Sequence, residues 1–295
     1  MTAPLATTDI AVEVEPADPF ELDIIVFDKP GRELVAPLLR SRLSETKVVY
    51  RMRGDFYREY RFEGLSYPKR WAAINAILPQ LDGALAVNRT LADLIRTRSR
   101  VDPVGVAGLS LDADAWPTAR HTTEDLRCLT LTNALYLPKI QPIIEWAPVV
   151  DAVLKTHGGV WRIGGRGVYA DRLREALAPY PRVRFEGYVD AKRALAESNC
   201  LLHPSNLDGL PNSILEAMAT GLPVITNDFP SFVEIGWPVA VARDDGELRA
   251  MLSRALNPTW RAARGEAGRQ RVREEHSHEA VGREYERFFR QVLRR

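Results

Sequence analysis

Two short apolar runs with a helix-like segment between them constrain the fold of this chain more than any other feature. The runs are residues 200–203 and 223–226, and each has the length of a buried strand. A tight turn at 209–211 follows the first run, and Asn212 or Ser213 is then expected to cap a helix. The order strand, loop, helix, strand predicts that the helix N-terminus lies at the carboxyl end of a sheet.

Two carboxylates flank this expected helix start. Asp208 precedes the turn, and Glu216 is expected in the first turn of the helix. The free N–H groups and the positive dipole end of a helix favour a phosphate, and carboxylates accept hydrogen bonds from sugar hydroxyls. A nucleotide diphosphate sugar suits both features. The same residues also fit an ordinary helix start packed on a sheet, and both interpretations stay open at this point.

Length and composition set broad limits. A chain of 295 residues with 45% hydrophobic content predicts two domains with real cores. The net charge of +1 gives no general attraction to nucleic acid, so no nucleic-acid partner is expected. Cys128 and Cys200 lie far apart within apolar runs and are expected to be buried, reduced thiols. Neither a spanning apolar run nor a secretory signal is found, which favours a cytoplasmic protein.

The first part of the chain alternates between strand-like and helix-like segments after an acidic tail. Residues 1–19 contain no Lys or Arg and predict a flexible tail. Residues 20–115 are predicted to form an N-terminal Rossmann-like domain, followed by a linker within 109–122. Its expected strands are 22–27, 47–52, 84–87 and 103–107, the first of them buried on both faces, and its helical segments are 33–42, 67–79 and 89–98.

A second alternating series begins at residue 126. It predicts a C-terminal domain over 116–279, while the final helix, within 280–295, is expected to pack back on the N-terminal domain. Residues 164–167 (GGRG) are expected to break the chain in a turn. The predicted architecture is α/β, with two doubly wound domains facing a cleft and an abbreviated N-terminal one. The further strands are expected at 126–132, 160–163 and 183–185, and the helices at 140–157, 169–178, 192–197, 246–256 and 260–275.

Several motifs in the second series resemble the carboxyl-terminal half of a retaining glycosyltransferase of family 4, which has the GT-B fold. Two acids separated by seven residues and followed by AMA-x-G-x-P-V are far more specific than a lone glycine loop. The amino-terminal half resembles the family more loosely, at 86–94 and 104–116, and its usual first strand and glycine-rich loop are missing, which implies a short variant. The motifs are 182–187 (RVRFEG), 203–205 (HPS), 208–216, 217–223 (AMATGLP) and Glu234.

The resemblance implies a donor site for a UDP- or GDP-sugar. Glu216 would bind the ribose, and Asp208 the hydroxyls of the transferred sugar. Main-chain N–H groups after the turn would hold the diphosphate or the sugar, and Val189 would contact the base through its backbone. The implied donor-binding residues are Asn133, Gly164, Gly165, Arg166, Val189, Leu210, Pro211, Asn212, Ser213 and Glu216.

The resemblance also implies the catalytic residues Lys139, Asp208 and Arg53. Lys139 would neutralise the departing diphosphate, while Asn133 stands where the family has a second cation, an arginine. Arg53 is expected to be a buried side chain that pairs either with a phosphate or with Asp55 or Glu59.

The implied reaction is a metal-independent transfer of a hexosyl or N-acetylhexosaminyl group, with retention, to a glycan or lipid-linked hydroxyl. A non-catalytic nucleotide-sugar-binding partner subunit and a nucleotide-sugar epimerase of the same fold are the alternatives. Asp112 and Asp114 resemble a metal motif but lie in the linker, and His276 and His278 have no third ligand nearby. Arginines within 261–295 are expected on a solvated helical face, and peripheral contact with an anionic membrane stays open.

Overall fold

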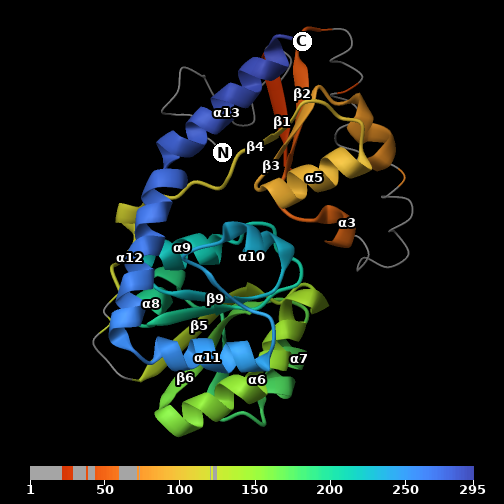
Figure 1. Ribbon diagram of the computed structural model, residues 1–295. Helices are drawn as coiled ribbons and strands as arrows, with labels where there is room; N and C mark the ends of the chain where they lie inside the picture. The colour runs from red at the N-terminus through yellow and green to blue at the C-terminus, as the bar shows by residue number, and fades with distance from the viewer. Residues whose placement is uncertain are drawn as a thin grey trace. The chain divides into compact units, whose positions relative to one another are not determined.

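The computed structural model describes residues 22–28, 38, 44–59, 72, 74–119, 121 and 125–295 (Figure 1). The acidic tail predicted at 1–19 lies outside the described residues. The same is true of most of the helix predicted at 33–42. The chain forms two compact units. Unit 1 comprises Met1–Ser110 and His276–Arg295, and unit 2 comprises Leu111–Glu275.

The described part of unit 1 is a parallel sheet with the strand order β1-β2-β3-β4. The strand β1 is only half-buried, in contrast to the expectation of a strand covered on both faces, because it lies at the edge of this sheet. The elements are β1 (Ile24–Phe27), β2 (Lys47–Met52), α3 (Phe56–Glu59), η5 (Leu78–Gln80), β3 (Gly83–Ala86), α5 (Arg89–Arg98), β4 (Val104–Val106) and α13 (His278–Leu293).

The last helix, α13, packs against the sheet of unit 1 (Figure 1). Its apolar stripe places Tyr285, Phe288 and Phe289 in one core with Val49 and Leu85. The contact is close, since a Cβ on the glycine of β4, Gly105, would lie 2.5 Å from a ring carbon of Phe288. Residues that lie far apart in the sequence therefore build one core.

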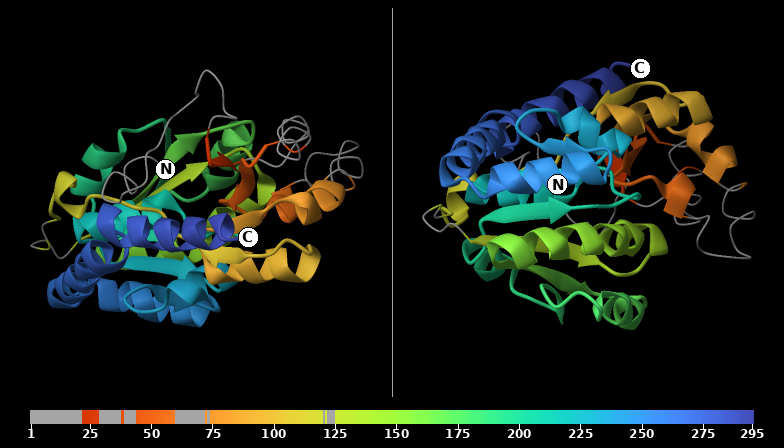
Figure 2. Two further views of the ribbon diagram at one scale, coloured as in Figure 1. Left: turned by 90° about the horizontal axis from the view of Figure 1, so that it is seen from above. Right: turned by 60° about the horizontal axis from the view of Figure 1, so that its bottom comes forward.

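Unit 2 contains a parallel sheet of six strands in the order β10-β9-β8-β5-β6-β7, with helices on both faces (Figure 2). Of these elements, α10 and β10 were not predicted. The elements are η6 (Ala113–Ala115), β5 (Leu126–Asn133), α6 (Leu137–His157), β6 (Gly159–Arg166), α7 (Ala170–Leu177), β7 (Val183–Gly187), α8 (Ala191–Ala196), β8 (Cys200–His203), α9 (Asn212–Thr220), β9 (Val224–Asn227), α10 (Pro230–Ile235), β10 (Ala240–Ala242), α11 (Asp245–Ala255) and α12 (Pro258–Glu275).

The turn predicted at 164–167 is wrong, because its first three residues continue strand β6. The glycines serve close packing instead. A Cβ on Gly164 would lie 2.3 Å from a methyl carbon of Val189, and one on Gly165 would lie 2.0 Å from the carbonyl oxygen of Thr132. Of the three glycines at 164–167, Gly167 alone, with φ of 152°, has a backbone conformation that favours glycine.

Helix α12 was expected to present its arginines to solvent, but two of them are buried. Arg261 is fully buried and donates hydrogen bonds to the carbonyl oxygens of Ala255 and Leu256, at 2.5 and 3.0 Å. Arg269 donates to the carbonyl oxygen of Ala219 at 2.6 Å, at the end of α9. These arginines satisfy carbonyls that the ends of helices leave without partners, and they fix α9 against α12.

Both cysteines are free and buried, as predicted. Among the described residues, no helix is long and apolar enough to cross a membrane.

Candidate functional site

The carboxyl edge of the unit 2 sheet brings together residues that are distant in sequence. Strand β5 lies beside β8, so the first turn of α6 lies next to the loop that follows β8. Lys139 on α6 and Asp208 in that loop form an ion pair, with 2.5 Å between Lys139 Nζ and Asp208 Oδ1. Both side chains are largely buried, with exposed fractions of 13% and 15%.

His203, the last residue of β8, contacts the same carboxylate. Its Nε2 lies 3.4 Å from Asp208 Oδ2, and its Nδ1 lies 3.2 Å from Ser213 Oγ. The ring also packs edge-on against Phe232, with 5.3 Å between ring centroids. In the sequence, His203 belongs to the HPS motif at 203–205, and no role at the site was predicted for it. A lone histidine at a strand end carries no signal for these contacts, although its position five residues before Asp208 places both at one sheet edge.

The charge of Asp208 is set by these partners. Burial alone would raise the pKa of the carboxyl group. The hydrogen bond with His203 and the charge of Lys139 outweigh that effect and hold the pKa well below its usual value. Asp208 is therefore an ionised acceptor over the whole physiological pH range.

The start of α9 differs from the predicted cap. The helix begins at Asn212, and the residue in the capping position is Pro211, which is extended. Asn212 and Ser213 lie inside the first turn, and the Ser213 hydroxyl contacts His203 instead. No side chain of the described residues caps this helix. The N–H of Ile214 donates to the carbonyl oxygen of Pro211 at 3.2 Å, so the N–H groups of Asn212 and Ser213 are the ones that stay available to a ligand.

Glu216 lies in the second turn of α9 rather than in the first, because the helix begins four residues before it. The side chain is half-buried, and burial raises the pKa of its carboxyl group. A carboxylate in this setting gains from accepting hydrogen bonds from a bound hydroxyl.

The neighbouring strands end at the same edge with a second group of predicted residues. Asn133 ends β5 and pairs in register with Arg166, which ends β6. The Arg166 guanidinium lies 5.6 Å from the ring of Tyr188, a side chain that is 76% exposed. Val189 packs against Gly164, as described above. The side chain of Lys192, in α8, does not join this group; it donates to the carbonyl oxygen of Ala115 at 3.0 Å.

Arg53 lies in unit 1, directly after β2, and it is not the buried arginine that was expected. Its side chain is 51% exposed, and its Nη1 lies 3.8 Å from Asp28 Oδ2. The predicted partner Asp55 instead accepts a hydrogen bond from the main-chain N–H of Arg58. The buried arginine is Arg51, because residue 51 lies within the central strand β2 whereas residue 53 follows its end.

The two motifs that resembled metal ligands have other contacts. Asp114 pairs with Arg269 and Arg273 of α12, at 3.3 and 2.8 Å. His276 Nδ1 lies 3.0 Å from the carbonyl oxygen of Leu109, and His278 Nδ1 lies 3.0 Å from Ser110 Oγ. Within the described residues, no three side chains of the metal-ligating types come together.

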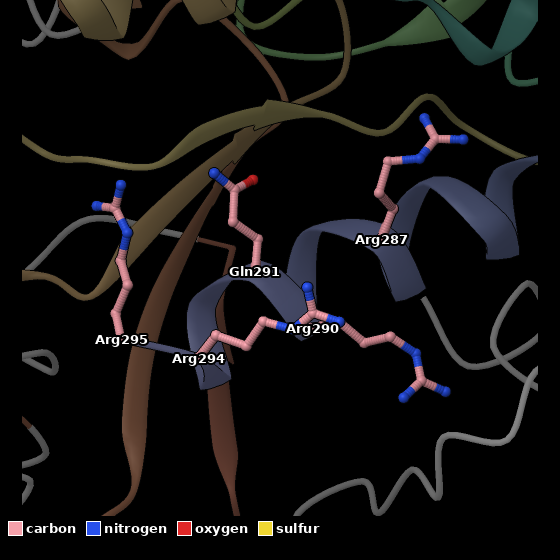
Figure 3. Close-up of a pocket in the computed structure, with 5 residues that line it drawn as sticks. All are labelled: Arg287, Arg290, Gln291, Arg294 and Arg295. Carbon is pink, nitrogen blue, oxygen red and sulfur yellow. The ribbon is translucent and has the colours of Figure 1, made fainter.

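A separate hollow of about 440 Å³ lies in unit 1 at the end of α13 (Figure 3). Two of its arginines have acidic partners: Arg290 pairs with Glu286 at 2.7 Å, and Arg295 with Asp102 at 2.5 Å. The other two arginines, Arg287 and Arg294, form no ion pair with any of the described residues. The hollow is lined by Arg287, Arg290, Gln291, Arg294 and Arg295.

A lysine–aspartate pair and an uncapped helix at the carboxyl edge of a parallel sheet define an α/β protein that is suited to a phosphate-bearing ligand. Comparison with known proteins gives the family. Residues 143–257 match the family described as "Glycosyl transferases group 1". The chain is also 36% identical to the viral protein "Putative glycosyltransferase ORF31" (virus isolate Australia/Victoria) over 295 residues, which cover 99% of this chain and 93% of that protein. The chain belongs to the group 1 glycosyltransferases.

Solved structures with the same fold include TarM, a sucrose-phosphate synthase and HepE. A mutant of S. aureus TarM, in complex with fondaparinux, alpha-GlcNAc-glycerol and UDP, gives a TM-score of 0.72 at 15% identity over 90% of this chain. This chain spans about half of TarM, 55% of its length. Sucrose-phosphate synthase of Thermosynechococcus elongatus gives 0.75 at 17% identity, covering 94% of this chain and 75% of that one.

Anabaena HepE, in complex with UDP and glucose, gives a TM-score of 0.74 at 15% identity, covering 92% of this chain and 78% of HepE. At such low identities the likeness shows the fold. It is the α/β fold of GT-B glycosyltransferases, consistent with two Rossmann-like domains, as predicted.

Proposed function

We propose that this chain is a retaining glycosyltransferase of family 4 that transfers a sugar from a nucleotide diphosphate donor to a hydroxyl acceptor. The observation that carries the proposal is the buried Lys139–Asp208 pair beside the uncapped start of α9. A diphosphate needs a cation and N–H donors, and this edge of the sheet offers both. The TarM and HepE structures are complexes with UDP, which supports a UDP-sugar, with a GDP-sugar as the other donor to test.

Each donor group has a proposed partner in unit 2. The main-chain N–H groups of Leu210, Asn212 and Ser213 bind the diphosphate or the sugar. Glu216 binds the ribose hydroxyls, and Asp208 accepts from the transferred sugar. Gly164, Gly165 and Arg166, at the end of β6, face the phosphates together with Asn133, and the backbone of Val189 contacts the base. Lys139 has three N–H donors, so it is able to bind Asp208 and a phosphate oxygen at the same time.

In the proposed reaction, the bond between the anomeric carbon and the diphosphate oxygen breaks, and a bond to the acceptor oxygen forms on the same face. The departing phosphate accepts the proton of the acceptor hydroxyl, so atoms and charges balance without a protein base. The protein supplies orientation and positive charge, and Lys139 is the side chain that neutralises the leaving group. No metal ion takes part in the proposal. Unit 1 is assigned to the acceptor.

The test is transfer from UDP- and GDP-linked hexoses and N-acetylhexosamines in the presence of EDTA, with glycans and lipid-linked glycans as acceptors. We expect acceptor-dependent release of the nucleoside diphosphate and, by NMR, a product with the anomeric configuration of the donor. Donor binding without transfer would identify a non-catalytic partner subunit. Conversion of the donor sugar without an acceptor would identify an epimerase.

We further propose that the protein is cytoplasmic and contacts an anionic membrane surface through the arginine-lined hollow of α13. The segment 287–295 contains four arginines and no acid, and Leu293 beside them is 47% exposed. Basic side chains next to an apolar one suit the surface of an anionic bilayer. Such a contact would bring a lipid-linked acceptor to unit 1.

A further inference from the structure

The Asp208 carboxylate is held from two sides by the protein itself. Oδ1 accepts from Lys139 and Oδ2 faces His203 Nε2. Since an ionised carboxylate only accepts, the proton of this second contact belongs to His203 Nε2. Each oxygen has two lone pairs, so Asp208 keeps room for a hydroxyl of a bound sugar.

His203 is in turn fixed in place. It is buried, the ring of Phe232 packs on it, and Ser213 Oγ lies against Nδ1. These two contacts, together with the contact to Asp208, define the orientation of the ring. Ser213 belongs to the first turn of α9, so the same turn that offers N–H groups to a ligand also holds the histidine.

We infer that His203 and Ser213 are positioning residues, which hold Asp208 so that Lys139 points at the leaving phosphate. The proposal rests on the proposed function. The chain Ser213–His203–Asp208–Lys139 connects the start of α9 to the start of α6. Without His203, the carboxylate is free to rotate, and the ammonium group moves with it. Displacements of about 1 Å in a reacting constellation cost up to about 10²-fold in rate.

The first experiment measures the hydrogen bonds of the His203 ring by NMR and does not depend on enzymatic activity. The protein has five histidines, and ¹⁵N labelling of histidine with His203→Gln for assignment isolates the ring signals of His203. We expect the proton on Nε2, a shift of its Nδ1 resonance in Ser213→Ala, and a shift of its Nε2 resonance in Asp208→Asn. Ser198→Ala is the matched control, because it removes another buried hydroxyl, which is bonded at 2.7 Å to the carbonyl oxygen of Ala194. Ring signals that respond to neither variant would overturn the inference, whatever the activity of the protein.

The second experiment is kinetic. His203→Phe keeps an aromatic ring against Phe232 but removes both ring nitrogens, and we expect kcat to fall 10- to 100-fold with less than a threefold change in the KM of the donor. Ser213→Ala should cost less, about 3- to 10-fold, and Ser213→Thr should restore most of it. An equal loss in Ser213→Ala and Ser213→Thr, or a loss confined to KM, contradicts a positioning role. Absence of transfer by the wild-type protein removes the proposed function and leaves the NMR result standing.

Discussion

The two units carry charged groups at equivalent places but hold them differently. In both, the groups lie at the carboxyl ends of neighbouring parallel strands. In unit 2, Lys139 and Asp208 are largely buried, 2.5 Å apart and tied to His203. In unit 1, Arg53 and Asp28 follow the ends of β2 and β1 and are 3.8 Å apart, with about half of each side chain exposed.

The difference is between a site whose geometry is held by further buried contacts and an ion pair at the protein surface. An exposed ion pair is worth little, because solvent screens it and both side chains lose freedom. A buried pair persists only when its geometry and further hydrogen bonds offset desolvation. The unit 2 pair meets that condition through His203 and Ser213, which is why we place the chemistry there.

The variant Lys139→Ala is the strongest test of this difference between the two units. Loss of one group that stabilises developing charge commonly lowers the rate by about 10²–10³. We expect such a fall in kcat, measured by release of nucleoside diphosphate. Lys155→Ala is the matched control, since it removes a lysine of the same helix that is paired with Asp151 at 2.6 Å. Full activity in Lys139→Ala would remove the lysine from the mechanism.

Glu216→Ala tests the ribose assignment in the same unit. A hydrogen bond to a charged group contributes about 1.5–3 kcal/mol, so we expect donor affinity to weaken about 10- to 100-fold. Isothermal calorimetry with the donor measures it directly, and kcat at saturating donor should change far less. Glu175→Ala, an exposed acid on α7, serves as the control. Unchanged affinity in Glu216→Ala would show that the ribose binds elsewhere.

The pH dependence of stability tests how tightly Asp208 is held. Its pKa is depressed in the folded state, so its contribution is present above the unfolded value, about 3.9, and is lost as the pH falls below it. We expect the unfolding free energy of the wild type to drop between pH 5 and pH 3 by about 1 kcal/mol more than that of Asp208→Asn, and to keep falling below pH 3 by at most about 1.4 kcal/mol per pH unit. Urea unfolding at several pH values checks this. Parallel curves for the two proteins would mean that the carboxylate is not specially stabilised.

The sequence predicted much of unit 2 because its elements are separated by clear local signals. Apolar runs predicted β8 and β9, and the carboxylate spacing identified Asp208 and Glu216. The placement of Lys139 beside Asp208 needs the adjacency of β5 and β8, which no local pattern in a single sequence encodes. The resemblance to a family assigned both residues to one donor site, but it did not predict their ion pair.

Two predictions were wrong for physical reasons, one at Arg261 and one at the start of α9. Arg261 was counted as solvated because arginine is usually exposed, but the carbonyls of Ala255 and Leu256 give its guanidinium a buried set of acceptors. The predicted cap failed because Pro211 enters α9 in an extended conformation, which moves Ser213 into the helix. In both cases a contact or a backbone conformation near the residue, rather than the usual preference of its residue type, decided the position.

A smaller effect is expected at the arginines of α13, for which we propose a membrane contact. A basic side chain near an anionic bilayer contributes about 1 kcal/mol, so Arg287→Gln and Arg294→Gln should each weaken vesicle binding about fivefold. Flotation with vesicles of phosphatidylglycerol and phosphatidylcholine measures this, and pure phosphatidylcholine should not bind. Arg283→Gln is the control, because this arginine of the same helix is already paired with Glu279. Equal binding by all of these variants would exclude the arginine-lined hollow as the membrane contact.

The smallest expected effect, at Arg53, decides whether unit 1 shares in the chemistry. An exposed ion pair contributes about 0–1 kcal/mol to stability, so Arg53→Ala should leave the stability of the protein nearly unchanged. Because we place the chemistry in unit 2, we also expect kcat to change less than about threefold. Arg51→Ala provides the contrast, because Arg51 is buried, 3.5 Å from the same Asp28 and 5.5 Å from the ring centroid of Tyr285. We expect it to lower the melting temperature of the protein, since its removal leaves a gap beside the core of α13. A loss of kcat in Arg53→Ala as large as that in Lys139→Ala would return Arg53 to the catalytic group and make exposure a poor guide to function in this protein.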